Sequence, residues 1–400
     1  MLSDYCRLIY NLALAERKEV WDSEKIKISY IDQQNHLPEF KEQYPEYNQV
    51  YSKVLQMSLN TLDANYHSFL ELIKVDSTAR PPGFRGRRYF FTMKYNQSGF
   101  KYVNNQIKLS HAVPGGAKLV FNMPENIQFT KVKQVEVFQD YKGKWFLSVV
   151  DEPILPEYID NGLYQAWDLG VTKQVGVNIE GKFIEVINAR PDKYWNRTID
   201  KIQGRRDHCK KRDMRKKNCR KSSKRWVQLN NIKHKFERKR SNQIKDFQHK
   251  KSLMIVTNTK ANTIVIGDLD VKRMPKSKKA NRHLNRSTQG TGYLGRFAGF
   301  LTYKADLIGK RAIEVSERYS SQTCCCCGKR HDMPLQKRVM SCDCGNYIDR
   351  DRNSAVNIMI EFLSQNALWL SYQQFVDNLR KTGVEIRPLH SQEAPCASVG

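Results

Sequence analysis

Apolar residues recur at two different spacings along the chain, and the change between them divides the sequence into regions. Over residues 1 to about 75 they return at steps of three and four, which places them on one face of a helix. The clearest stripe consists of Val50, Val54, Leu55, Leu59 and Leu62. Pro81-Pro82-Gly83 interrupts this pattern. The spacing therefore predicts a helical region that ends at residue 83.

A different texture follows as far as residue 158, where short runs of aromatic and β-branched residues alternate with turn formers. The runs occupy residues 88–91, 106–109, 118–121, 132–138 and 145–150. Runs of this length and composition are typical of strands. The pattern predicts a small β domain over residues 84–158.

From residue 159 onwards, strand-like and helix-like patterns alternate. Apolar runs around Gly170 and Gly181 predict three strands within residues 164–187. An apolar stripe within 196–251 predicts helix, and one helix of that length would span roughly 84 Å. We therefore expect two helices with a break near Asn230-Asn231. Further patterns predict a strand over 263–266, a helix over 295–310, a strand over 312–315 and a last helix over 351–370. This order fits a mixed sheet with helices on its faces.

The net charge of the chain indicates what kind of partner it binds. The chain has 68 Lys and Arg against 41 Asp and Glu, a net charge of +27, and residues 196–251 alone hold 22 basic and five acidic residues. A solvated charged face is the alternative explanation, but such density would repel itself unless an anion were bound. We expect nucleic-acid contacts from Arg205, Arg206, Lys210, Lys211, Arg212, Arg215, Lys216, Lys217, Arg220, Lys221, Lys224 and Arg225.

Membrane partners are not expected. The chain has no apolar run of about 18 residues, and its first residues lack the basic-then-apolar pattern of a signal peptide. Six of the ten cysteines lie between Cys324 and Cys344. Clustering of this kind without a secretion signal predicts a metal site in a reducing compartment, rather than a disulfide framework.

The cysteine cluster has the spacing of a zinc site. Two close pairs, 14 residues apart, could supply the four thiolates of a tetrahedral centre: Cys324 and Cys327, then Cys342 and Cys344. Redox-active thiols or coincidence are the alternatives. A closed site with four cysteines is structural, not catalytic.

Carboxylates stand at a strand end and at a helix start. Asp168 closes an apolar strand, and Asp349 and Asp351 precede the last helix. An acid beside a helix start is often only a cap, and Asp168 could be a turn residue. The functional alternative is a magnesium site, since two Mg²⁺ ions held by carboxylates can clamp the attacking and leaving oxygens of a phosphodiester.

Four motifs carry a resemblance to a known family. They are AWDLGVTKQVGV at 166–177, IVIGDLDVKRM at 264–274, TYKADLIGKRAIEVSERYSSQTCCCCG from Thr302, and SCDCGNYIDRDRNSAVNIM from Ser341. Together they resemble the TnpB (OrfB) family of transposon-encoded RNA-guided endonucleases, which are related to CRISPR type V effectors. The resemblance runs from about residue 5 to about residue 365.

The resemblance implies an α/β RNase H-like (RuvC) nuclease core with a zinc-ribbon insertion, preceded by a helical recognition region and a small β-barrel-like wedge domain. The expected boundaries are 1–83 for the recognition region, 84–158 for the wedge, 159–317 and 349–370 for the core, 318–348 for the zinc insertion, and 371–400 for a partly disordered tail. Members usually have a strand ahead of the first helix, so we expect either a truncated reading frame or one that begins upstream.

The resemblance also implies the activity and partners. The protein would use a guide RNA from the transposon end to cut double-stranded DNA next to a short motif. It would need catalytic Mg²⁺ and structural Zn²⁺, and no small-molecule substrate. It would be cytoplasmic, and associated with the nucleoid when bound to DNA.

Two catalytic acids carry over directly, and the third is displaced. Asp168 matches the acid of the first nuclease motif and Asp351 that of the third. Where many members have a catalytic Glu in the second motif, this chain has Gly267. Some relatives place that acid later, and Glu317, in Glu317-Arg-Tyr-Ser-Ser, fits that pattern.

Other acids near the second motif are alternatives to Glu317. They are Glu314, Asp268 and Asp270, of which Asp268 should face the other side of the strand. A chain without a third acid would be a nuclease-weakened, RNA-guided repressor. A transposase that joins strands itself is a further alternative, but no tyrosine in a His-containing motif supports it.

Overall fold

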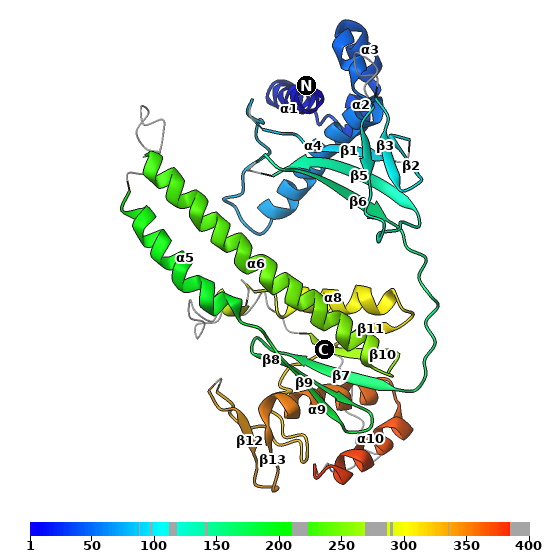
Figure 1. The fold of residues 1–400 in the computed structure, drawn as a ribbon, viewed down its shortest axis with the longest axis vertical. Coiled ribbons are helices and arrows are strands. Elements are labelled where there is room, and N and C mark those ends of the chain that lie inside the picture. The colour runs from blue at the N-terminus through cyan, green and yellow to red at the C-terminus, as the bar shows by residue number, and fades with distance from the viewer. Residues whose placement is uncertain are drawn as a thin grey trace. The chain divides into compact units, whose positions relative to one another are not determined.

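The computed structural model describes residues 1–87, 89–96, 98–111, 118–140, 143–209, 223–268, 286–288, 291–334 and 336–384. The chain forms two compact units, Met1–Ile154 and Leu155–Gly400, which Figure 1 shows as ribbons. Eight of the twelve predicted basic contact residues, from Lys210 to Lys221, lie outside the described residues, as does Asp270.

Helices come first in the first unit. They are α1 (Leu2–Glu24), α2 (Tyr30–Asn35), α3 (Leu37–Gln43), the 3-10 helix η1 (Pro45–Gln49) and α4 (Ser52–Ile73). The predicted stripe is the buried face of α4, and it packs against Tyr10 and Leu14 of α1. The helical region predicted from the spacing is confirmed.

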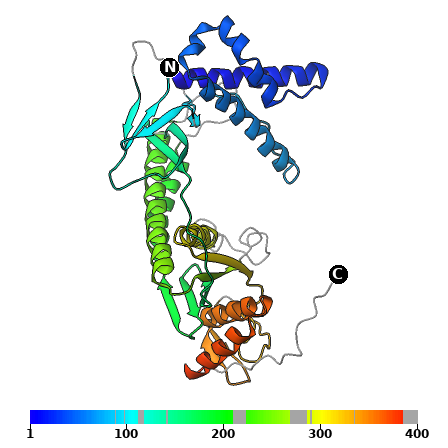
Figure 2. The same cartoon turned by 90° about the vertical axis from the view of Figure 1, so that its right-hand side faces the viewer.

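Two antiparallel sheets complete the first unit, and Figure 2 separates them in colour from the blue helices. One has the order β1 (Met93–Asn96), β5 (Val132–Gln139), β6 (Trp145–Asp151), and the other β2 (Phe100–Val103), β3 (Gln106–Leu109), β4 (Val120–Asn122). Tyr95 and Val135 share one buried cluster with the helices. The expected boundary at residue 83 therefore separates helices from strands, but not two compact bodies.

The strand expected over residues 88–91 is wrong. The first strand begins at Met93. Phe91 instead donates its backbone N–H to Ser3 Oγ (2.7 Å) and accepts a hydrogen bond from the same hydroxyl (3.0 Å). Because these bonds satisfy the backbone of Phe91, the segment lies along α1 rather than in a sheet.

A five-stranded mixed sheet forms the centre of the second unit. Its order is β11 (Arg311–Ser316), β10 (Thr263–Asp268), β7 (Tyr164–Leu169), β8 (Lys173–Asn178), β9 (Phe183–Ile187). β10 runs parallel to β7 and to β11, whereas β8 is antiparallel to both of its neighbours. The mixed sheet predicted from the order of elements is confirmed.

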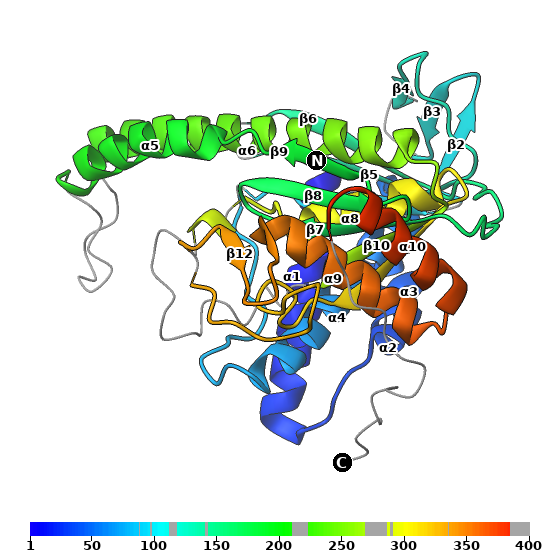
Figure 3. The same cartoon turned by 90° about the horizontal axis from the view of Figure 1, so that it is seen from below.

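Helices cover both faces of this sheet (Figures 1 and 3). Ala166, Val265 and Val315 share one core with α9 (Arg350–Gln365) and α10 (Trp369–Lys381). Residues of opposite parity, such as Trp167 and Ile266, share another core with α6 (Lys224–Asn258) and α8 (Gly295–Asp306). Strand parity thus decides which helix a side chain meets.

The predicted break near Asn230-Asn231 is wrong. α6 is continuous for 35 residues and runs beside α5 (Pro191–Asp207), as Figure 1 shows. Leu229 is buried, and Asn230 Oδ1 accepts a 2.9 Å hydrogen bond from Arg206. These contacts with α5 support the helix through the two asparagines. We call α5 and α6 the basic hairpin.

A helix occupies the first part of the segment expected from residue 371 as a partly disordered tail. α10 continues to Lys381 and buries Tyr372, Phe375, Val376 and Leu379. These residues recur at steps of three and one, an amphipathic stripe that packs α10 into the same core as α9. None of the helices in the described residues is both long and apolar enough to cross a bilayer.

Candidate functional site

Three acids from distant parts of the sequence meet at one edge of the sheet. Asp168 is the second-last residue of β7, Glu317 directly follows β11, and Asp351 lies in the first turn of α9. Since β7, β10 and β11 are parallel, their carboxyl ends lie at the same edge. α9 contacts this part of the sheet through its buried face, and its N-terminus brings Asp351 to the other two acids.

Gly267 leaves the space that Glu317 occupies. A Cβ atom at position 267 would lie 2.5 Å from Glu317 Oε2 and 2.8 Å from Ile358 Cδ1. The Glu317 side chain therefore fills the volume that a side chain on β10 would need. The absence of a side chain at Gly267 therefore makes room for the carboxylate of Glu317, which follows β11.

Two of the alternative acids, Glu314 and Asp268, lie on the α8 side of the sheet. Gly267 pairs with Val315, whereas Glu314 pairs with Ile266, whose side chain lies in the α8 core. Asp268 and Glu314 line a small cavity of about 60 Å³ beside Leu294 and Ala298. This position favours Glu317 over either alternative.

Asp168 and Glu317 both have pKa values above the usual range of a carboxyl group. Burial, followed by the negative charge of Asp351, raises the pKa of Asp168 to about 7, while a hydrogen bond from Ser354 opposes the shift. Burial, followed by the charge of Asp168, raises the pKa of Glu317 to about 8. Glu317 Oε2 is buried and accepts no hydrogen bond from the described residues. The positive charge of Arg350 opposes the shift at Asp168 without cancelling it.

Asp349 and Asp351 have different roles at the start of α9. Asp349 is the N-cap, and its carboxylate accepts hydrogen bonds from the backbone N–H groups of Asp351 (2.9 Å) and Arg352 (3.2 Å). It also forms a 3.1 Å ion pair with Lys173. Because Asp349 does the capping, the carboxylate of Asp351 is not needed for it. Only Arg350 approaches that carboxylate among the described cations, at 3.5 Å.

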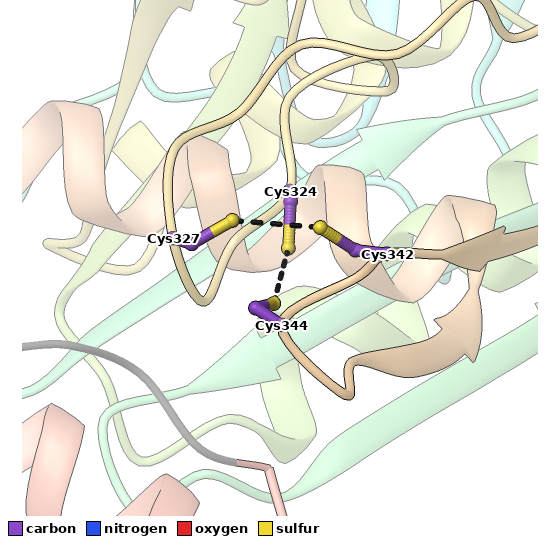
Figure 4. A group of neighbouring side chains, drawn as sticks. All are labelled: Cys324, Cys327, Cys342 and Cys344. Carbon is purple, nitrogen blue, oxygen red and sulfur yellow. Dashed lines mark hydrogen bonds between the residues drawn. The ribbon is translucent and has the colours of Figure 1, made fainter.

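The four predicted cysteines come together in space (Figure 4). The sulfurs of Cys324, Cys327, Cys342 and Cys344 all lie within 4.8 Å of one another. The second pair flanks the turn between β12 (Val339–Ser341) and β13 (Tyr347–Asp349). Each cysteine offers one sulfur ligand to this group. We call residues 324–344 the cysteine clip.

The clip favours the thiolate form of one ligand. Burial alone would raise the pKa of Cys324, but hydrogen bonds from Asn346 Nδ2 (3.2 Å) and from backbone N–H groups lower it to about 7. Thiolates, not thiols, bind metals. Cys325 instead packs in the core beside α9. The arrangement could hold one metal ion with four sulfur ligands.

The predicted contact residues of the basic hairpin differ in their exposure to solvent. Arg205, Lys224 and Arg225 are exposed. Arg206 instead turns into the seam between the helices, where its guanidinium lies 5.4 Å from the Trp226 ring centroid and bonds Asn230. Arg206 therefore stabilises the hairpin.

Sequence reasoning missed two further basic residues on α5. Arg197 and Lys201 are exposed and precede Arg205 at steps of four, so the three share one face of the helix. None of the three forms an ion pair with another described residue. The spacing of four in the sequence was the signal that could have revealed this stripe.

Comparison with known proteins connects these features. A model of the TNB domain of Cas12f1-like proteins matches residues 295–358. A Streptomyces pristinaespiralis protein named "Putative RNA-guided DNA endonuclease" is 27% identical over 367 residues, covering 90% of this chain and 84% of the relative. "TnpB-like protein L79" of Acanthamoeba polyphaga mimivirus is 34% identical over 142 residues, 34% of this chain and 26% of the viral protein. The chain is therefore similar to TnpB-like proteins and to proteins named as putative RNA-guided DNA endonucleases.

The fold also has a counterpart among solved structures. The Cas12f1 chain in a cryo-EM structure of its complex with sgRNA and target DNA superposes with a TM-score of 0.57 at 15% identity, covering 89% of this chain and 81% of that one. The matched TNB region, 295–358, contains Glu317, the cysteine clip and Asp351. The resemblance found in the sequence motifs is confirmed.

Proposed function

We propose that the protein is an RNA-guided DNA endonuclease with a RuvC-type centre built on Asp168, Glu317 and Asp351. The observation that carries the proposal is the space at Gly267 that the Glu317 carboxylate fills, 2.5 Å from where a Cβ would stand. It gives the site a third acid at the carboxyl edge of the parallel strands. Two relatives whose names begin with "Putative RNA-guided DNA endonuclease", which the chain covers over 84% and 86% of their length, support the same function.

Magnesium fits this donor set. The three side chains offer hard oxygen ligands, and the buried, unpaired Glu317 Oε2 lacks the positive partner that a cation would supply. Bound Mg²⁺ would generate the water nucleophile and offset the charge that develops on the phosphate. Two Mg²⁺ ions held by such carboxylates could clamp the attacking and leaving oxygens of the phosphodiester.

The residues of the chain supply position and charge. Asp168 and Glu317 place two carboxylates near each other at a strand edge, and a bound cation would stabilise both in their charged form. Asp351 completes the set from α9, and Asp349 keeps that helix start in place through its cap. The basic hairpin binds the phosphates of the guide and of its target DNA, so that base pairing, not protein contacts, reads the sequence.

The cysteine clip is a structural zinc site in this proposal. Four thiolates without an open position are typical of zinc that holds a fold together. We expect about one zinc per chain in metal analysis of the purified protein. Cys342→Ser should lose it, whereas Cys209→Ser, far from the cluster, should keep it. Equal zinc content in both variants would contradict the site.

A matched pair of acids tests the nuclease proposal. The protein is purified with the RNA that accompanies it, that RNA is sequenced, and a plasmid matching its guide is offered with Mg²⁺. Glu317→Gln should lose cleavage but keep guide-dependent DNA binding, while Glu314→Gln, on the opposite face, should cut normally. If Glu314→Gln is inactive and Glu317→Gln cuts, the site is wrong.

The same assay separates the rival function. An RNA-guided repressor with a weakened nuclease would occupy the target DNA without cutting it, at any Mg²⁺ concentration. Cleavage by the unmodified protein that disappears in Asp168→Asn would exclude this rival. Further parts of the proposal are a guide transcribed from the transposon end and a short target-adjacent motif, which the RNA sequencing and a randomised flanking library would define.

A further inference from the structure

Three polar side chains lie on the buried side of α9, where apolar residues would be expected. Asn353 is 0% exposed and Ser354 2% exposed, and Asn357 follows one helical turn later. Buried polar groups are costly unless they are fully hydrogen-bonded. The hydrogen-bond partners of these side chains therefore indicate their role. We call these three residues the α9 anchor.

The two asparagines bind one loop at two carbonyl groups. Asn353 Nδ2 donates to the carbonyl oxygens of Ser320 (3.2 Å) and Thr323 (2.7 Å). Asn357 Nδ2 donates to the same two oxygens, at 2.7 Å each. Four hydrogen bonds from two side chains thus fix the segment that leads from Glu317 to the cysteine clip.

The loop needs such support. Tyr319 has a φ of 66°, in the left-handed region that residues with a side chain seldom adopt. The N–H of Ser320 closes a turn on the carbonyl of Glu317 at 3.0 Å. An unfavourable backbone conformation persists when its surroundings determine it. Here the anchor supplies those surroundings directly next to Glu317.

Ser354 extends the same network to a second acid. Its hydroxyl lies 2.7 Å from Ser320 Oγ, and its side chain is close enough to the Asp168 carboxylate to lower the pKa of that group. One side chain therefore connects β7 to the loop after β11. Asp168 on β7 and the loop that follows Glu317 are thus both held near Ser354 of α9.

The anchor also reaches the cysteine clip. Asn353 Oδ1 accepts a 3.0 Å hydrogen bond from the backbone N–H of Cys325, next to Cys324. Asn353 thus binds the loop both before and within the first cysteine pair. Hydrogen bonds from this one side chain therefore join the clip to the loop that follows Glu317.

We propose that Asn353, Ser354 and Asn357 are positioning residues that set Glu317 against Asp168 and couple this geometry to the state of the cysteine clip. This inference rests on the proposed nuclease function and adds a role for the clip. Emptying the clip, or removing the anchor while zinc stays bound, should displace Glu317 in the same way. Binding of nucleic acid, which uses the basic hairpin, should not change.

The test compares two asparagines that make similar bonds. Asn357→Leu removes the donor to the loop with little change in size, whereas Asn378→Leu removes a 3.1 Å bond from α10 to the carbonyl of Ile179, away from the acids. We expect Asn357→Leu to lower kcat by about 100-fold, as for a misplaced catalytic group. KM, guide-dependent DNA binding and zinc content should stay unchanged. Asn378→Leu should keep kcat.

A measurement independent of activity completes the test. Amide hydrogen exchange over residues 317–327 should become faster in Asn357→Leu, and in the wild type after zinc removal, but not in Asn378→Leu. Equal losses of kcat in both variants, or unchanged exchange in Asn357→Leu, would overturn the coupling. If the wild type does not cut DNA, the nuclease proposal fails, while the exchange data still decide on the anchor.

A second variant covers the case in which Asn357→Leu does not fold. Ser354→Ala removes only the hydroxyl that joins Ser320 to Asp168. It should lower kcat without changing KM, and Ser354→Thr, which restores a hydroxyl, should recover part of the loss. Normal kcat in folded Ser354→Ala would overturn the role of Ser354.

Discussion

Substituting Gly267 by Ala offers the sharpest perturbation of the site. The new Cβ would stand 2.5 Å from Glu317 Oε2 and 2.8 Å from Ile358 Cδ1, whereas ordinary contacts begin at 3.4 Å. The Glu317 carboxylate must therefore move by about 1 Å. The backbone at Gly267 is not among the glycines with positive φ, so side-chain space, and not backbone strain, decides the outcome.

The expected loss is larger in catalysis than in stability. Both crowded atoms are ends of flexible side chains, so overpacking should cost at most about 1–3 kcal/mol, offset by about 0.4–1 kcal/mol because Ala restricts the unfolded chain more than Gly. Displacing a catalytic group by about 1 Å can lower the rate about 100-fold, equivalent to about 2.7 kcal/mol in the barrier.

Single-turnover cleavage of a guide-matched plasmid at saturating Mg²⁺ measures the first quantity, and thermal unfolding the second. Gly299→Ala on α8 is the control, since nothing lies within 4 Å of its Cβ position. The double variant Gly267→Glu with Glu317→Ala should recover activity, because the acid then enters the same volume from β10. Wild-type cleavage by Gly267→Ala would refute the reasoning about Glu317.

Three further predictions follow from other parts of the structure. Replacing Arg197, Lys201 and Arg205 together by Gln should lower the slope of log affinity against log salt by about 2–3, since each phosphate contact contributes about 0.7–0.9; an unchanged slope would argue against the α5 stripe. Burial raises the pKa of Cys6 to about 12, so its thiolate should form only as pH approaches that value, and a thiol reagent at pH 8 should modify Cys6 only after unfolding. Phe375→Ala should destabilise the second unit by about 3–5 kcal/mol in denaturant titration, because its ring is fully buried in the α9–α10 core; a loss below about 1 kcal/mol would show that α10 is dispensable.

Local patterns were sufficient for the elements and for part of the site. Strand alternation located β7 and β10, and short motifs singled out Asp168 and the two cysteine pairs. Parity along β10 correctly placed Asp268 on the face opposite Gly267. Each of these inferences depends on residues close in sequence.

The errors have a common physical origin. Asn230-Asn231 is a poor helical dipeptide alone, but contacts from α5 carry α6 through it. The segment at Phe91 has the composition of a strand, yet hydrogen bonds to Ser3 hold it on α1. The space shared by Gly267 and Glu317, and the anchor formed by Asn353, arise from neighbours far apart in the sequence, which no local pattern reveals.

The wide separation of the three acids along the chain has a consequence for synthesis. While the protein is being made, β7 and Asp168 leave the ribosome long before Asp351 and α9. The first unit and the basic hairpin also precede Asp351 in the chain. On the proposed function, a nascent chain would therefore lack its third acid, and with it DNA cleavage, until synthesis is nearly finished.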